Sequence, residues 1–154
     1  MTSTSIIVRK SERRLDLIRD GELRKIYRIA LGPSPIGDKQ VEGDGKTPEG
    51  EFYIFTKNPR SKFTLSLGLS YPSRKDAERG LAAGLISNDE YADILAALRE
   101  GLKPPQKTAL GGEIYIHGGG IAGDWTKGCI AMADDDMREL FEEVERGDTV
   151  TILP

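Results

Sequence analysis

The side chains of this sequence best suited to covalent chemistry are its single cysteine, Cys129, and its single histidine, His117. His117 ends an apolar run that begins at Ile114, and glycines follow it directly. Gly128 precedes Cys129 in a second turn. A thiol with a pKa near ~8.5 is a weak nucleophile at neutral pH until an imidazole takes its proton. A strand end followed by a returning loop can bring the two side chains together, so the pattern predicts a catalytic Cys–His pair.

Each of these residues also has a purely structural interpretation. A lone cysteine commonly packs as a small apolar residue, and a lone histidine commonly serves the fold. If the pair is catalytic, the glycines leave room for a substrate backbone, and the amides of Gly128 and Cys129 are free to bind an oxyanion. An active pair predicts that Cys129 reacts with thiol reagents well below about pH 8, whereas a buried structural thiol stays inert.

Three other patterns are weaker. The Gly-Lys-Thr run at 45–47 resembles the end of a phosphate-binding loop, but that motif needs a glycine where Gln40 stands. The run at 117–120 resembles the oxyanion loop of lipases, which also need a serine elbow and a separate histidine. The acidic run at 134–136 favours a helix start, where carboxylates offset the macrodipole, over a metal site.

Composition and charge exclude several classes of protein. The chain has 154 residues, which suits one domain, and its net charge of −3 lacks the basic excess of a nucleic-acid binder. One cysteine and one histidine are too few for a disulfide framework or a zinc site. No apolar run reaches the roughly 18 residues of a membrane span. The N-terminus has no apolar signal-peptide core, which predicts a cytoplasmic protein unless a leader was removed.

Alternating apolar residues and turn signals predict a mainly β domain around the pair. We expect strands at 6–8, 14–18, 23–31, 51–56, 63–67, 113–117 and 149–153. An Asp-Gly turn at 20–21 predicts a tight hairpin. The strand that follows this turn, over residues 23–31, is expected to place Leu23, Tyr27, Ile29 and Leu31 on one face.

Helical patterns occupy the middle of the chain and its last third. Ser73 and Ser87 stand at N-cap positions, and Glu90 completes a capping box with Ser87. We therefore predict a helical insertion over 73–112 within one domain that spans 1–154. A further helix is predicted over 134–146, in the C-terminal half.

These motifs resemble the L,D-transpeptidase catalytic domain family, also called the YkuD domain, in its ErfK/YafK-like branch. The family signature is a His-Gly pair at a strand end followed by Ser/Thr-x-Gly-Cys, and here His117-Gly118 precedes Thr-Lys-Gly-Cys at 126–129. The Lys-Thr-Pro-Glu-Gly loop at 46–50 and the closing strand also resemble the family. The resemblance implies an L,D-transpeptidase-like β-sandwich, with the helical insertion as a lid or a substrate wall.

The resemblance also implies a mechanism that needs no metal or cofactor. His117 would deprotonate Cys129, whose thiolate would attack a peptidoglycan stem tetrapeptide between diaminopimelate and D-alanine to form a thioester. The Gly118 carbonyl would orient the imidazole, and the amides of Gly128 and Cys129 would bind the oxyanion. Contacts with the stem peptide are expected from Trp125, Thr126 and Lys127.

Two positions depart from the family pattern. Lys127 stands where most members have a histidine, and Ala131 stands where they have an arginine or asparagine. The family arginine is thought to bind a substrate carboxylate, so Lys127 and Lys46 are candidate replacements. Trp125 has two interpretations, a core anchor or a platform for the stem peptide.

The motif does not indicate which nucleophile attacks the thioester. An amine acceptor gives transpeptidation, which the family favours, whereas water gives an L,D-carboxypeptidase or a related amide hydrolase. A protein of a different class, a non-catalytic wall-binding module, would keep the fold without needing the pair. The resemblance implies a place in the bacterial envelope or periplasm, whereas the missing signal peptide favours the cytoplasm.

Overall fold

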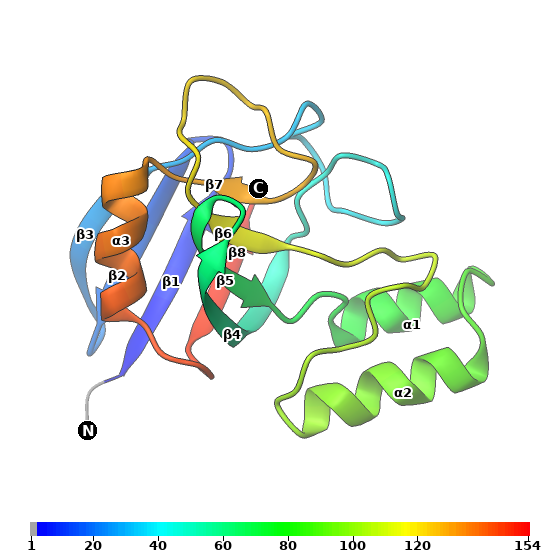
Figure 1. The fold of residues 1–154 in the computed structure, drawn as a ribbon. Helices are drawn as coiled ribbons and strands as arrows, with labels where there is room; N and C mark the ends of the chain where they lie inside the picture. Colours follow the sequence, from blue (N-terminus) through cyan, green and yellow to red (C-terminus); the bar gives the residue numbers. More distant parts are fainter. Residues whose placement is uncertain (1–2) are drawn as a thin grey trace.

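A computed structural model describes residues 3–154 and shows one curled eight-stranded sheet with helices around it (Figure 1). The strands lie in the order β3-β2-β1-β8-β4-β5-β6-β7. The mainly β fold predicted from the sequence is therefore confirmed. The elements are β1 (Thr4–Arg9), β2 (Arg14–Arg19), β3 (Glu22–Arg28), β4 (Gly50–Ser61), β5 (Thr64–Leu69), α1 (Arg74–Ala82), α2 (Asn88–Arg99), β6 (Tyr115–His117), β7 (Ile130–Ala131), α3 (Asp134–Glu143) and β8 (Thr149–Leu153).

The hairpin of β2 and β3 follows the sequence pattern except at Leu23. Both residues of the turn at 20–21 have positive φ, as the predicted tight turn requires. After Leu17, which pairs with Lys25, the pairing shifts register so that the next residue of β2 pairs with Leu23. This bulge turns Leu23 to the other face, where it is 49% exposed, whereas Tyr27 stays buried. The prediction that both side chains lie on one face was wrong for that reason.

The sheet curls until its two edges meet. β8 lies between β1, to which it is parallel, and β4, to which it is antiparallel. At the edges, Ala30 and Ala131 exchange two backbone hydrogen bonds of 2.9 Å. The curl encloses the main apolar core, whose members include Ile6, Leu15, Leu31, Phe52, Leu67, Ile116, Met132, Leu140 and Val150.

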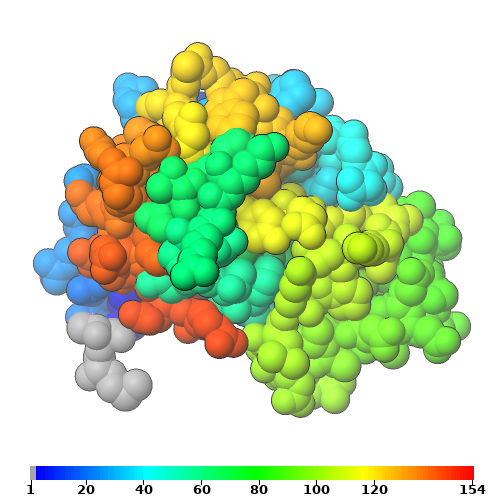
Figure 2. Space-filling view, viewed as in Figure 1, coloured from blue at the N-terminus to red at the C-terminus, as the bar shows by residue number. Residues whose placement is uncertain are grey.

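The two predicted helices of the insertion, α1 and α2, form a lobe beside the sheet (Figures 1 and 2). The Ser87 hydroxyl accepts a hydrogen bond from the Glu90 amide at 3.1 Å, and the Glu90 carboxylate accepts one from the Ser87 amide at 2.9 Å. This is the predicted capping box. The lobe has an apolar core of its own, formed by Ala77, Ile86, Ile94 and Leu110.

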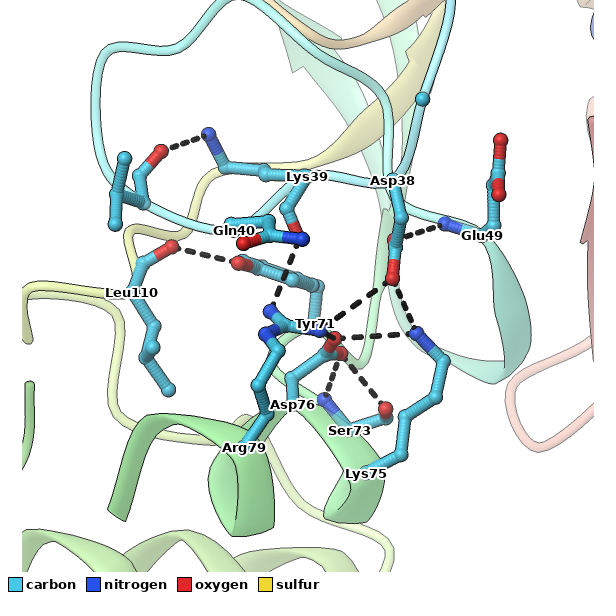
Figure 3. Close-up of polar contacts among 12 residues, drawn as sticks. Asp38, Lys39, Gln40, Glu49, Tyr71, Ser73, Lys75, Asp76, Arg79 and Leu110 are labelled. Atoms are coloured by element: carbon cyan, nitrogen blue, oxygen red, sulfur yellow. Dashed lines mark hydrogen bonds and ion pairs between the residues drawn. The ribbon is translucent and has the colours of Figure 1, made fainter. Parts of the chain in front are cut away.

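Ion pairs connect this lobe to the loop that follows β3 (Figure 3). Lys75 Nζ lies 2.7 Å from Asp38 Oδ2, and Arg79 Nη1 lies 3.4 Å from the same oxygen. Asp76 is fully buried and also accepts a hydrogen bond of 2.9 Å from the Ser73 amide. These contacts fix α1 against the sheet domain, so the lobe has a defined position beside it.

The third helix is shorter than the sequence pattern predicts. α3 ends at Glu143, not at residue 146, because Val144 is extended and fully buried. The Val144 carbonyl accepts a hydrogen bond of 2.8 Å from Lys57 Nζ instead of one from the next helical turn. Among residues 3–154, no helix is long and apolar enough to cross a membrane.

Candidate active site

A cleft of about 1030 Å³ lies between the β4–β5 hairpin, β6 and the loop that precedes β7. Cys129 and His117 both line it, although His117 ends β6 and Cys129 lies in the loop before β7. From the helical insertion over 73–112, the cleft receives Leu102 and Lys103, which follow α2. The insertion therefore forms part of one wall, and its predicted role as a lid stays a prediction.

His117 ends β6, and its imidazole is held by its neighbours. Nδ1 lies 2.6 Å from the Gly118 carbonyl, which can only accept, so Nδ1 carries the proton of the neutral ring and Nε2 is the basic nitrogen. Phe63 stacks on the ring with centroids 4.5 Å apart, and the Trp125 ring lies at 5.5 Å. Burial lowers the pKa of His117, against the effect of the Gly118 hydrogen bond. The imidazole is therefore neutral at pH 7 and can accept a proton.

The glycines after His117 are needed for close packing. A Cβ on Gly118 would lie 2.6 Å from the Asp134 carboxylate and 2.8 Å from the Phe63 carbonyl. Asp134, the first residue of α3, also accepts a hydrogen bond of 2.8 Å from the Gly119 amide. The acidic start of this helix thus fixes the loop that supplies the carbonyl partner of the imidazole.

Cys129 is partly buried in the cleft, and its thiol donates a hydrogen bond of 3.3 Å to the Glu113 carbonyl. Burial raises the pKa of the thiol to about 11, opposed by a hydrogen bond from the Tyr115 amide and reinforced by the Glu113 charge. In the free protein the cleft therefore holds a thiol and a neutral imidazole. This high pKa argues against reaction of Cys129 with thiol reagents well below about pH 8, which is what an active pair was expected to show.

We expect the alkylation of Cys129 by iodoacetamide to be slow at pH 7. Its rate is expected to rise about tenfold per pH unit up to about pH 10, because the reactive thiolate increases in that proportion below its pKa. Intact-protein mass spectrometry at each pH measures the rate, and the urea-unfolded protein, whose thiol titrates near ~8.5, is the control. A rate that levels off below about pH 7 would indicate a thiolate–imidazolium pair and contradict this assignment.

The two predicted oxyanion donors have different surroundings. The Gly128 amide donates to Thr126 Oγ1 at 3.3 Å, whereas the Cys129 amide takes part in none of the hydrogen bonds found within residues 3–154. Thr126 is 4% exposed and donates from Oγ1 to the Cys129 carbonyl at 2.8 Å. Its hydroxyl therefore shapes the turn before Cys129 instead of being free for the predicted substrate contact, and Gly128 is the weaker oxyanion candidate.

The Lys-Thr-Pro-Glu-Gly loop lies directly under the Cys129 turn. Thr47 is fully buried and donates from Oγ1 to the Gly128 carbonyl at 2.8 Å. Gly128 has a φ of +121°, and a Cβ there would lie 2.8 Å from the Lys46 carbonyl, so a glycine is required. The Lys46 side chain lies over Gly37 and does not line the cleft, so it is not a replacement for the family arginine.

A buried lysine holds this loop in turn. Lys10 is 2% exposed, and its Nζ donates to the carbonyls of Gly37 and Thr47 at 2.8 and 2.7 Å. The same nitrogen lies 3.0 Å from the Glu49 carboxylate. Sequence reasoning missed Lys10, because nothing in its local pattern separates it from an exposed lysine at the end of a strand.

The walls of the cleft are strongly basic. Five cationic side chains line it against one carboxylate, that of Glu113, and within residues 3–154 none of the five forms an ion pair. The cations are Arg60, Lys62, Lys103, Lys127 and Arg146. Of these, only Lys127 is a candidate from the sequence pattern. The arrangement suits an anionic ligand.

Trp125 and Ala131, the other two predicted positions, differ in exposure. Trp125 is 40% exposed, lines the cleft and donates from Nε1 to the Gly120 carbonyl at 2.9 Å. It therefore both packs and presents a surface to a ligand. Ala131 is fully buried at the closure of the sheet, so this position offers no group to the cleft.

Comparisons with known proteins agree with this geometry. Residues 3–152 match the family model described as the L,D-transpeptidase catalytic domain, YkuD. YafK of Escherichia coli (strain K12), named provisionally as an L,D-transpeptidase, is 27% identical over 142 residues, which cover 88% of this chain and 44% of YafK.

Solved structures share the fold at lower identity. The helical cell shape determining protein Pgp2 from Campylobacter jejuni (K307A mutant) superposes with a TM-score of 0.69 at 23% identity, covering 98% of this chain and 47% of Pgp2. An L,D-transpeptidase from Mycobacterium smegmatis superposes with a TM-score of 0.60 at 12% identity. The match covers 99% of this chain and 59% of that one. The chain thus spans less than half the length of YafK and of Pgp2.

Proposed function

Because the chain belongs to the L,D-transpeptidase catalytic domain family, we propose that it transfers acyl groups of peptidoglycan stem tetrapeptides through a thioester on Cys129. The observation that most supports this is the placement of Cys129 and His117 in one cleft, with Nδ1 of the imidazole anchored by Gly118. That anchor leaves Nε2 as the base. A wall-binding module, the candidate from a different class, would need neither the thiol nor the base.

Acylation uses the neutral pair. Nε2 of His117 takes the thiol proton as Sγ of Cys129 attacks the carbonyl carbon that links diaminopimelate to D-alanine, and the C–S bond forms. The Cys129 amide donates to the resulting oxyanion, a contact whose loss typically costs about 2.7–4 kcal/mol of barrier. The imidazolium then gives its proton to the D-alanine nitrogen as the C–N bond breaks. The thioester remains, and His117 is neutral again.

The basic walls of the cleft suit the carboxylates of a stem peptide. Lys127 lies in the loop before Cys129 and lines the cleft, so we assign it the carboxylate contact that the family arginine makes elsewhere. The exposed face of Trp125 offers a platform for the peptide chain. A substrate of this kind places the work of the protein at the cell envelope.

The second candidate function differs only in the last step. If water resolves the thioester, the same residues give an L,D-carboxypeptidase or a related amide hydrolase. We favour transfer, because the family is named for it.

Incubation with a disaccharide tetrapeptide, with and without added D-methionine, tests the proposal. We expect mass spectrometry to find the product in which D-methionine has replaced D-alanine, with the tripeptide as a minor product. The tripeptide alone, formed at the same rate with and without D-methionine, would instead identify a hydrolase. Retention of intact tetrapeptide on the protein would identify a binding module.

A further inference from the structure

Glu113, the single carboxylate that lines the cleft, has no part in the acylation steps. We propose that Glu113 and Tyr115 form a subsite for the ammonium group of the amine acceptor, which favours transfer of the acyl group to an amine over its hydrolysis. This inference rests on the proposed thioester chemistry, and it names the group that would make the protein a transferase.

Hydrogen bonds of its main chain hold Glu113 close to the sulfur of Cys129. Its carbonyl accepts the hydrogen bond of 3.3 Å from the Cys129 thiol, and its amide donates to Gln106 Oε1 at 2.7 Å. Gln106 is itself fixed, because its Nε2 donates to the Tyr71 carbonyl at 2.8 Å. The Glu113 carboxylate therefore lies within one side chain's length of the sulfur that would carry the acyl group.

The Glu113 carboxylate is oriented but not neutralised. Oε2 accepts a hydrogen bond of 2.8 Å from the Tyr115 hydroxyl, and the carboxylate forms no ion pair within residues 3–154. Burial and the Glu113 charge raise the pKa of Tyr115, so its hydroxyl stays a donor. Because the side chain is exposed to the cleft, the remaining acceptor positions are available to a ligand.

The charges around Glu113 select the kind of ligand. Five cations that form no ion pair in the described part of the chain line the same cleft and repel a simple cation. A ligand whose ammonium group binds Glu113 must therefore also carry a carboxylate that faces these cations. The subsite thus fits a zwitterion. A free D-amino acid and the D-centre of diaminopimelate both carry ammonium and carboxylate groups on one carbon, and their nitrogen is the atom that must reach the thioester.

In the transfer step, the bound ammonium first loses one proton to solvent. The amine nitrogen then attacks the thioester carbon, the N–C bond forms, and the C–S bond breaks. His117 takes the second proton from nitrogen and returns it to the sulfur of Cys129. Water that attacks the same carbon has no charge for Glu113 to bind. The subsite therefore raises the rate of transfer to an amine and leaves the rate of hydrolysis unchanged.

Glu113→Gln keeps the shape of the side chain and removes its charge. With a subsaturating D-amino acid at pH 7, we expect the ratio of transfer product to tripeptide to fall roughly tenfold to a hundredfold, the usual effect of a lost charge-assisted hydrogen bond. Tyr115→Phe is expected to lower the ratio in the same direction. Glu51→Gln, at an exposed carboxylate outside the cleft, is the matched control and should keep the wild-type ratio.

Hydroxylamine, a nucleophile that is uncharged at pH 7, separates ammonium binding from a structural effect. We expect Glu113→Gln to retain the wild-type ratio of hydroxamate to tripeptide while it loses transfer to the D-amino acid. A wild-type ratio with the D-amino acid, or an equal loss with both nucleophiles, would overturn the subsite. A wild-type protein that forms the Cys129 thioester and only hydrolyses it would overturn the subsite and leave the acylation chemistry intact. If no thioester forms at all, the proposed function fails as well.

Discussion

Cys129→Ser is expected to lose all measurable tetrapeptide turnover, and His117→Ala to slow acylation by about 10²–10⁴-fold, the usual contribution of a general base. Burial in the cleft already raises the pKa of the thiol to about 11. A serine hydroxyl is a much weaker acid than a thiol, so its alkoxide is still harder to form in the same place. Without the base, the thiol must lose its proton to water. Tetrapeptide consumption followed by liquid chromatography measures both effects.

Rescue by a soluble base distinguishes the role of His117 from a structural one. Added imidazole is expected to restore part of the turnover of His117→Ala, because the substitution leaves space beside Phe63 for a small ring. The same addition should not restore Cys129→Ser. Near-native turnover in either variant, measured on protein with the thermal stability of the wild type, is incompatible with the proposed mechanism.

Lys10→Met is expected to lower the free energy of unfolding by about 3–5 kcal/mol, the usual cost of removing one member of a buried charged network. The substitution leaves the carbonyls of Gly37 and Thr47 without their donor and takes the partner of Glu49 away. Because Thr47 supports the Gly128 carbonyl, turnover should fall as well.

Urea unfolding followed by circular dichroism measures the change in stability. Lys107→Met is the matched control, since Lys107 is exposed and forms no ion pair within residues 3–154. We expect it to change the free energy of unfolding by less than about 0.5 kcal/mol. A loss below about 1 kcal/mol in Lys10→Met would show that the loop under Cys129 does not depend on this lysine.

The sequence pattern predicted correctly those turns and helix caps that depend only on neighbouring residues. The turn at 20–21 has the positive φ values that an Asp-Gly pair favours, and Ser87 caps its helix through Glu90 as predicted. Leu23 and the end of α3 were predicted wrongly, because both depend on distant partners. A register shift against β2 exposes Leu23, and Lys57 takes the Val144 carbonyl that would otherwise continue the helix.

The same division applies to the candidate site. Cys129 and His117 stand out as the single residues of their types in a glycine-rich segment, so the sequence was sufficient to propose them. Phe63 covers the imidazole from the β4–β5 hairpin, far away in the sequence, and only the pairing of β5 with β6 brings it there. Glu113 precedes β6 by a few residues, but its contact with the thiol depends on how that segment folds back against Cys129.

The most direct test of the account is the acyl-enzyme itself. The protein is mixed with a disaccharide tetrapeptide, quenched in acid within seconds, and analysed intact and after digestion by mass spectrometry. We expect an adduct with the mass of the substrate less D-alanine, located on the peptide that contains Cys129 and absent from Cys129→Ser. Turnover of the tetrapeptide without an adduct on Cys129, in a protein whose Cys129→Ser variant remains active, would contradict it.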